Sequence, residues 1–131
     1  MAFAASGRGT LLAEVREAMA RAAQGGDDLA RMTREVGIPL SDGVVAFTAG
    51  RYGEAIERIE PVRDIAHRFG GSHAQRDLIT LTLIESALRG GDRGRAKHYL
   101  AERQILKSDA SRWGRRLEAR ADVYAFQAEP P

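Results

Sequence analysis

The chain has 131 residues, of which 44% are hydrophobic and 29% charged, and its 20 basic and 18 acidic side chains leave a net charge of +2. This length and composition predict one globular domain. The chain contains no cysteine, which excludes a disulfide scaffold, thiolate metal sites and thiol catalysis. It has no apolar run of about 18 residues that could span a membrane. Its start lacks the continuous apolar core of a secretion signal. We therefore expect a cytoplasmic protein.

Alanine, leucine, arginine and glutamate recur at helical spacing, and β-branched residues never alternate as they do in strands. This pattern predicts an all-α fold of about seven helices. We expect the helices at 10–24, 27–35, 39–49, 53–69, 73–89, 93–107 and 110–126, between a flexible N-terminus at 1–9 and a flexible tail at 127–131.

Glycine and proline set the expected ends of these helices. Gly37 is expected to close the second helix, because glycine is the usual residue just beyond a helix end. Pro39 suits the first turn of the third helix. Pro61 interrupts the 53–69 pattern, but the apolar stripe resumes after it, so we expect a kinked helix rather than two separate ones.

An internal repeat is visible in two corners. Residues 50–55 and 91–96 share the pattern Gly-x-x-Gly-x-Ala at an offset of 41 residues. Several apolar positions match at the same offset, which predicts two copies of a helix–turn–helix unit. A helical bundle that reuses a favourable turn is the alternative. The expected organisation is a single domain over 10–126, with repeats at 39–69 and 73–107 and flanking helices at 10–36 and 110–126.

The first copy resembles the middle of a tetratricopeptide repeat. Gly50 matches the glycine before the turn, Tyr52 the aromatic residue after it, and Ala55 the alanine of the second helix. Gly43 stands at the place of the small residue in the first helix.

The second copy departs from that pattern. Arg93 replaces the aromatic residue and Ile84 replaces the small one, and the offset is longer than the usual period of about 34 residues. The chain is therefore similar to a divergent, TPR-like repeat.

A closer resemblance is carried by the segment 70–77, Gly-Gly-Ser-His-Ala-Gln-Arg-Asp, together with the segments 61–63 and 100–103. Over about 38–118 the chain resembles the C-terminal part of the tetratricopeptide repeat protein 38 family. The resemblance implies an α-solenoid of antiparallel helix pairs. It implies no reaction and no catalytic residues.

The most distinctive polar cluster stands at the start of the helix expected at 73–89 and contains His73, Gln75, Arg76 and Asp77. A helix N-terminus beside a guanidinium group is a ready receptor for anions. One hypothesis is therefore a small anion or ligand pocket near His73 and Arg76, in an accessory domain of a longer, enzyme-like protein.

The alternative for this cluster is structural. Ser72 and Gln75 can form a capping box. Arg76 or Asp77 would then pair with a charged residue of the preceding helix, Arg63 or Asp64.

A solenoid would present a groove lined by the first helix of each pair. The candidate groove residues are Thr48, Arg51 and Tyr52 from the first repeat, and Thr80 and Glu85 from the second. For Tyr52, packing within the corner is the alternative.

A basic stripe on the last expected helix contains Arg112, Arg115, Arg116 and Arg120. It suggests a surface for an acidic partner, and a solvated outer helix face is the alternative. Nucleic-acid binding is disfavoured, because the overall charge is nearly balanced and no aromatic residues interleave with the arginines on that helix face.

Catalytic and metal-binding motifs are missing from the sequence. The three histidines lack the spacing of helical zinc ligands, and neither a P-loop nor a nucleophile elbow occurs. We therefore expect no metal, no cofactor and no enzymatic activity. The leading hypothesis is a helical-repeat module that binds a peptide or partner protein. Self-association to a homodimer through the exposed ends of a short solenoid is a further alternative.

Overall fold

The computed structural model describes residues 9–69, 73–106, 116 and 119–121. Within these ranges the chain is all-α, as predicted, without a strand. Six α-helices are described there, close to the expected number of about seven: α2 (Gly9–Ala22), α3 (Asp28–Met32), α4 (Ile38–Thr48), α5 (Tyr52–Ile59), α6 (His73–Arg89) and α7 (Arg93–Leu106).

The seventh helix, expected at 110–126, lies largely outside the described residues, although Arg116 and residues 119–121 are helical. The tail at 127–131 and all but the last residue of the expected flexible N-terminus also lie outside them. Among the described residues, none of the helices combines the length and hydropathy that a membrane span needs.

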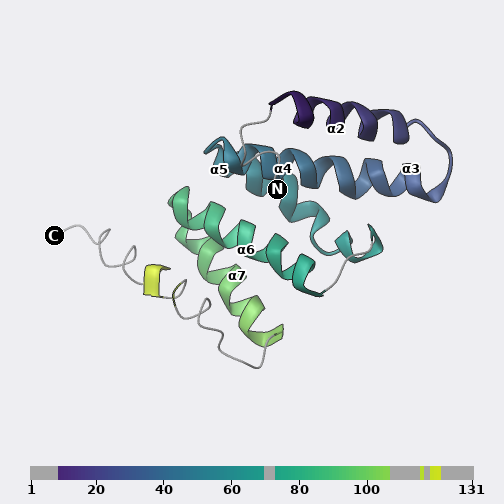
Figure 1. The fold of residues 1–131 in the computed structure, drawn as a ribbon. Coiled ribbons are helices and arrows are strands. Elements are labelled where there is room, and N and C mark those ends of the chain that lie inside the picture. The colour runs from purple at the N-terminus through teal and green to yellow at the C-terminus, as the bar shows by residue number, and fades with distance from the viewer. Residues whose placement is uncertain (1–8, 70–72, 107–115, 117–118, 122–131) are drawn as a thin grey trace.

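The helices pack in chain order (Figure 1). Helix α2 lies along the segment that contains α3 and α4, α4 packs on α5, α5 on α6, and α6 on α7. Tight corners join α4 to α5 and α6 to α7, which makes two consecutive helical hairpins. The bounds expected for α6 and α7 are confirmed to within a residue.

The two corners have the same backbone structure. Gly50 and Gly91 adopt φ angles of 76° and 77°, in the left-handed region that glycine enters without strain. The amide after each glycine bonds back to the carbonyl five residues earlier at 2.9 Å, Arg51 to Ala46 and Asp92 to Ala87. This is the hydrogen bond of a Schellman cap. The two corners, 41 residues apart, therefore share one backbone conformation.

The chain between α3 and α4 does not break at Gly37, so this expectation is wrong. Residues Thr33–Gly37 form a π-helical turn, in which the Ile38 amide bonds to the Thr33 carbonyl. Gly37 has ordinary helical angles, φ −60° and ψ −51°, and Pro39 lies in the first turn of α4 as predicted. Val36 is fully buried in this turn. Tertiary packing therefore overrides the helix-ending preference of glycine.

The chain after α5 is not the kinked helix expected over 53–69. Pro61 lies in a 3₁₀ turn and a second 3₁₀ turn follows, Glu60–Val62 and Ala66–Phe69. Proline lacks the amide that an α-helix needs, and its ring crowds the carbonyl one turn back. Val62 and Ala66 are nevertheless buried, at 6% and 4% exposed. The apolar stripe therefore continues through these turns without a continuous α-helix.

The main core lies between α5, α6 and α7. Its largest members are Ile56, Ile59, Leu83, Ile84 and Tyr99, each at most 2% exposed. Helix α6 is buried on several sides between residues 82 and 88. Leu78, near the start of the same helix, is 45% exposed.

Candidate functional site

Asp77, in the predicted polar cluster, is bound to helix α7. Arg103 donates from Nε and Nη2 to the two carboxylate oxygens of Asp77, at 2.9 and 3.0 Å. The Arg103 side chain is 10% exposed and the Asp77 side chain is 16% exposed. A bidentate pair of this kind fixes both distance and orientation. Asp77 therefore joins α6 to α7.

The other members of the polar cluster differ in their exposure. Gln75 is exposed and Arg76 is half-buried, while the side chain of His73 lies outside the described residues. Ser72, the expected cap, also lies outside them. The structural alternative paired Arg76 or Asp77 with Arg63 or Asp64, and the bidentate partner of Asp77 is Arg103, 26 residues further along the chain.

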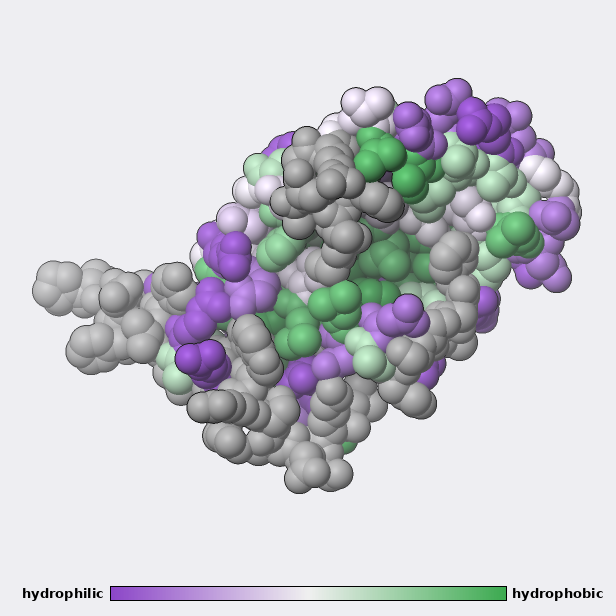
Figure 2. Space-filling model, in the orientation of Figure 1, coloured by the Kyte–Doolittle hydropathy of each residue, from purple (hydrophilic) through white to green (hydrophobic). Residues whose placement is uncertain are grey.

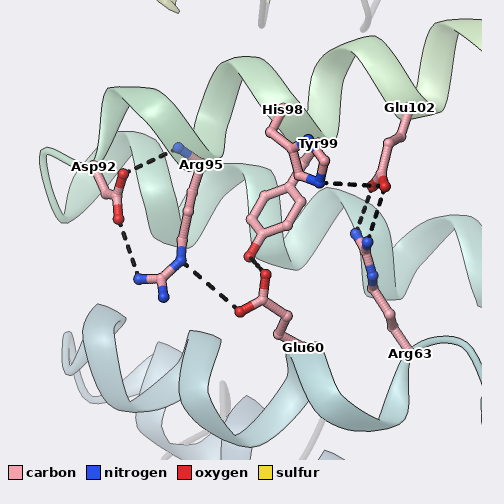
Figure 3. Close-up of polar contacts among 7 residues, drawn as sticks. All are labelled: Glu60, Arg63, Asp92, Arg95, His98, Tyr99 and Glu102. Atoms are coloured by element: carbon pink, nitrogen blue, oxygen red, sulfur yellow. Dashed lines mark hydrogen bonds and ion pairs between the residues drawn. The ribbon is translucent and has the colours of Figure 1, made fainter.

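A second set of contacts joins the turn after α5 to α7 (Figure 3). The Tyr99 hydroxyl donates to Glu60 Oε1 at 2.7 Å. Arg63 donates from both terminal nitrogens to the Glu102 carboxylate, at 2.7 and 3.0 Å. The Arg63 guanidinium also lies 5.2 Å from the centre of the Tyr99 ring, within the range of a cation–π contact. We call Glu60, Arg63, Tyr99 and Glu102 the Tyr99 network.

Three residues of α7 and its cap extend this network toward solvent. Asp92 accepts a hydrogen bond from the Arg95 amide at 3.0 Å and so caps α7, as its position predicts. Arg95 Nε lies 3.8 Å from Glu60, and His98 Nε2 lies 3.3 Å from Glu102. Figure 3 shows these side chains side by side along α7. The arrangement fixes the angle between the two hairpins.

The environment of the Tyr99 network shifts two pKa values. Burial raises the pKa of the Tyr99 hydroxyl far above its usual range, and the hydrogen bond to Glu60 raises it further. For Arg63, burial lowers the pKa, but the hydrogen bonds and charge of Glu102 outweigh burial and the net shift is upward. Both groups therefore keep their protons at neutral pH, as their donor roles require.

Tyr99→Phe is expected to lower the free energy of unfolding by about 1 kcal/mol at neutral pH, because it removes one buried hydrogen bond. Folding raises the pKa of Tyr99. The contribution of its hydroxyl to the free energy of unfolding is therefore complete below the unfolded-state pKa of about 10 and declines above it. Urea unfolding of both proteins from neutral to alkaline pH measures this. The difference between them should shrink above a pH of about 10, and a constant difference would contradict the assignment.

The three segments that carry the sequence resemblance meet in these contacts. The segment 61–63 supplies Arg63, and the segment 70–77 supplies Asp77. The segment 100–103 supplies the partners of both, Glu102 and Arg103. Their distinctive charges therefore serve inter-helix packing. The partners lie far apart in the chain, and no local spacing in the sequence could have identified them.

A further cluster lies beside the two corners and contains two of the predicted groove residues, Tyr52 and Glu85. Arg89 donates to Glu85 at 3.0 Å, and its guanidinium lies 5.5 Å from the centre of the Phe47 ring. The Phe47 and Tyr52 rings pack edge to face, 5.8 Å apart. Hydrogen bonds with Tyr52 and Glu85 raise the pKa of Arg89. We call Phe47, Tyr52, Glu85 and Arg89 the corner cluster. Tyr52 packs within this corner, which was the alternative to a groove position for this residue.

The five predicted groove residues do not share one surface. Thr48 and Arg51 are exposed, and each bonds within its own turn, to the Val45 carbonyl at 2.9 Å and to Glu54 at 2.7 Å. Thr80 and Glu85 are five residues apart on α6, which places them about 140° apart around the helix axis. A single groove along α6 therefore cannot contain both.

The predicted basic stripe is described only in part. Arg116 is exposed, and Arg120 donates to Glu85 of α6. Arg112 and Arg115 lie outside the described residues. Arg120 therefore contributes to packing of the C-terminal segment on α6.

No cluster of three metal-ligating side chains occurs among the described residues. The adjacent carboxylates Asp27 and Asp28 lie at the start of α3: Asp27 accepts a hydrogen bond from the Ala30 amide at 2.8 Å, and Asp28 pairs with Arg31 at 2.9 Å.

No protein-family model matches the chain, and no solved structure matches it.

Proposed function

We propose that this chain is a TPR-like helical-repeat module, a short solenoid of antiparallel helix pairs, that binds a peptide segment of a partner protein without catalysing a reaction. The observation that carries the proposal is the succession of two packed hairpins with the same Schellman corner at Gly50 and Gly91. Modules of this kind present the first helix of each pair to a ligand. Here those helices are α4 and α6.

The surface proposed for the peptide is the open face of α6 next to α4. Leu78 contributes an apolar side chain that is 45% exposed. Leu40 of α4 and Ile79 of α6 are half-buried against the core. Figure 2 shows apolar side chains gathered between α4 and α6 with charged side chains around them. An apolar anchor flanked by polar groups suits a short peptide that inserts one large apolar residue.

The test is selection of random peptides against the purified chain, followed by titration of a labelled selected peptide. Leu78→Asp is expected to weaken binding at least tenfold, or about 1.4 kcal/mol. Ile105→Asp is the matched control, because Ile105 of α7 is also a large apolar residue and is 85% exposed. Failure to select any peptide, or equal losses for the two variants, would refute the proposed surface.

A further inference from the structure

Helix α2 packs on the rest of the molecule through one side only. None of its 14 residues is buried. Leu12 and Met19 are half-buried, and Arg16 on the same side bonds to Asp42 of α4. These three positions define the side of α2 that faces α4, because residues three and four apart share one side of a helix.

A second apolar line of residues on α2 lies about 90° around the helix axis from that contact. Leu11, Val15, Ala18 and Ala22 follow one another at intervals of four, three and four residues, which places them in one line along the helix. Ala18 and Ala22 are exposed, Val15 is 37% exposed and Leu11 is half-buried. In Figure 2, apolar side chains run along α2 on the face toward the viewer, with charged side chains along the upper edge. We call these four residues the outer stripe.

We propose that the outer stripe of α2 binds the outer stripe of a second copy of this chain, with the two helices antiparallel. In this arrangement Leu11 faces Ala22 of the second copy and Val15 faces Ala18, so that each large side chain meets a small one. Symmetry repeats both contacts. Alternation of large and small residues lets two helices approach closely without voids.

Charges beside the stripe support the same register. Glu14 and Arg21 are both exposed and lie on one edge of the outer stripe. In the antiparallel arrangement Glu14 of one copy lies opposite Arg21 of the other, and the two-fold axis makes this pair twice. A parallel arrangement would instead place the edges that carry these charges on opposite sides of the interface, so that this pair could not form.

The expected dimer is weak. Helix α2 is about 21 Å long, and an interface of one helix pair falls below the size of stable protein–protein interfaces. Sedimentation velocity should therefore show a monomer in the low micromolar range and a rapidly exchanging dimer as the concentration approaches about 1 mM. A monomeric mass throughout that range overturns the proposal.

Two exposed alanines on opposite sides of α2 provide the first matched pair of variants. Ala18→Glu places a charge in the centre of the outer stripe and is expected to weaken self-association at least tenfold. Ala20→Glu makes the same change two residues away, outside the stripe, and should leave self-association unchanged. Equal behaviour of the two variants would show that any dimer forms elsewhere.

Charge reversal tests the register through the comparison of the double variant with Arg21→Glu, because both lose the pair that Arg21 forms with Glu17 within α2. Glu14→Arg and Arg21→Glu should each weaken the dimer several-fold, and the double variant should restore it, because the two cross-copy pairs re-form with exchanged charges. A double variant as weak as the sum of the two single changes would reject the antiparallel register.

The absence of cysteine from the sequence allows a direct check of the contact. A mixture of Val15→Cys and Ala18→Cys chains, treated with a short thiol cross-linker, should give mainly the mixed cross-linked pair. Ala20→Cys is the control and should remain uncross-linked. Leu78→Asp should leave the dimer intact, so that failure of this proposal and failure of the proposed peptide site are distinguishable.

Discussion

Replacing Arg103 with alanine is expected to lower the free energy of unfolding by about 3–5 kcal/mol, because it leaves the Asp77 carboxylate largely buried without its bidentate partner. The Arg103 side chain is 10% exposed and Asp77 is 16% exposed. Water can therefore replace the lost hydrogen bonds only after α6 and α7 separate locally. Urea unfolding followed by circular dichroism measures the loss.

The exposed pair between Arg16 and Asp42 is the matched control. Arg16 is 51% exposed, so Arg16→Ala is expected to cost less than about 1 kcal/mol. The double variant Asp77→Leu, Arg103→Met removes both buried charges and is expected to recover most of the stability lost in Arg103→Ala. Equal losses for the two alanine variants would show that the buried pair contributes no more than a surface pair.

The elements that the sequence predicted well are those determined by local geometry. The corners at Gly50 and Gly91 were predicted because a left-handed residue after a helix strongly selects glycine. The caps at Asp27 and Asp92 are likewise local, because a short carboxylate bonds to the free amides of the first turn. Helices α6 and α7 lie between such signals, and their bounds are accordingly close to the expected ones.

The elements that the sequence predicted poorly are those determined by packing. Gly37 is helical because the surrounding turn is buried, a fact that local propensity does not contain. The apolar stripe around Pro61 records burial and is equally compatible with 3₁₀ turns. The partners of Arg63 and Asp77 come from α7, and only the packing of the hairpins brings these residues together.

The predicted groove residues show a different limitation. Glu85 was assigned to an open groove from its residue type, but it accepts bonds from Arg89 and Arg120. Leu78, by contrast, is a large apolar residue of α6 that is 45% exposed. Helical spacing alone separates Thr80 from Glu85, so that part of the assignment could have been corrected without a structure.

Gly43→Ala is expected to lower the free energy of unfolding by about 1–3 kcal/mol, the range of overpacked cores. Alanine is the better helix former, and in open surroundings the same change would stabilise a helix by roughly 1 kcal/mol. At Gly43, however, a Cβ atom would lie 2.3 Å from Ile59 Cγ1 and 2.9 Å from its Cδ1. Ile59 is fully buried and cannot turn away into solvent.

Gly53→Ala is the control for this steric argument, because a Cβ atom at Gly53 in α5 would meet no atom within 4 Å. This variant should gain stability where Gly43→Ala loses it. In an Ile59→Ala background the two closest contacts disappear and the one with Arg58 Cβ at 3.2 Å remains, so Gly43→Ala should cost about 1 kcal/mol less there than in the natural chain, a coupling expected only of residues in contact. Equal gains at Gly43 and Gly53 would contradict the close approach of α4 and α5. A loss at Gly43 together with a gain at Gly53 would explain why the first hairpin has glycine at position 43, whereas the second hairpin accommodates the buried Ile84 at the matching position.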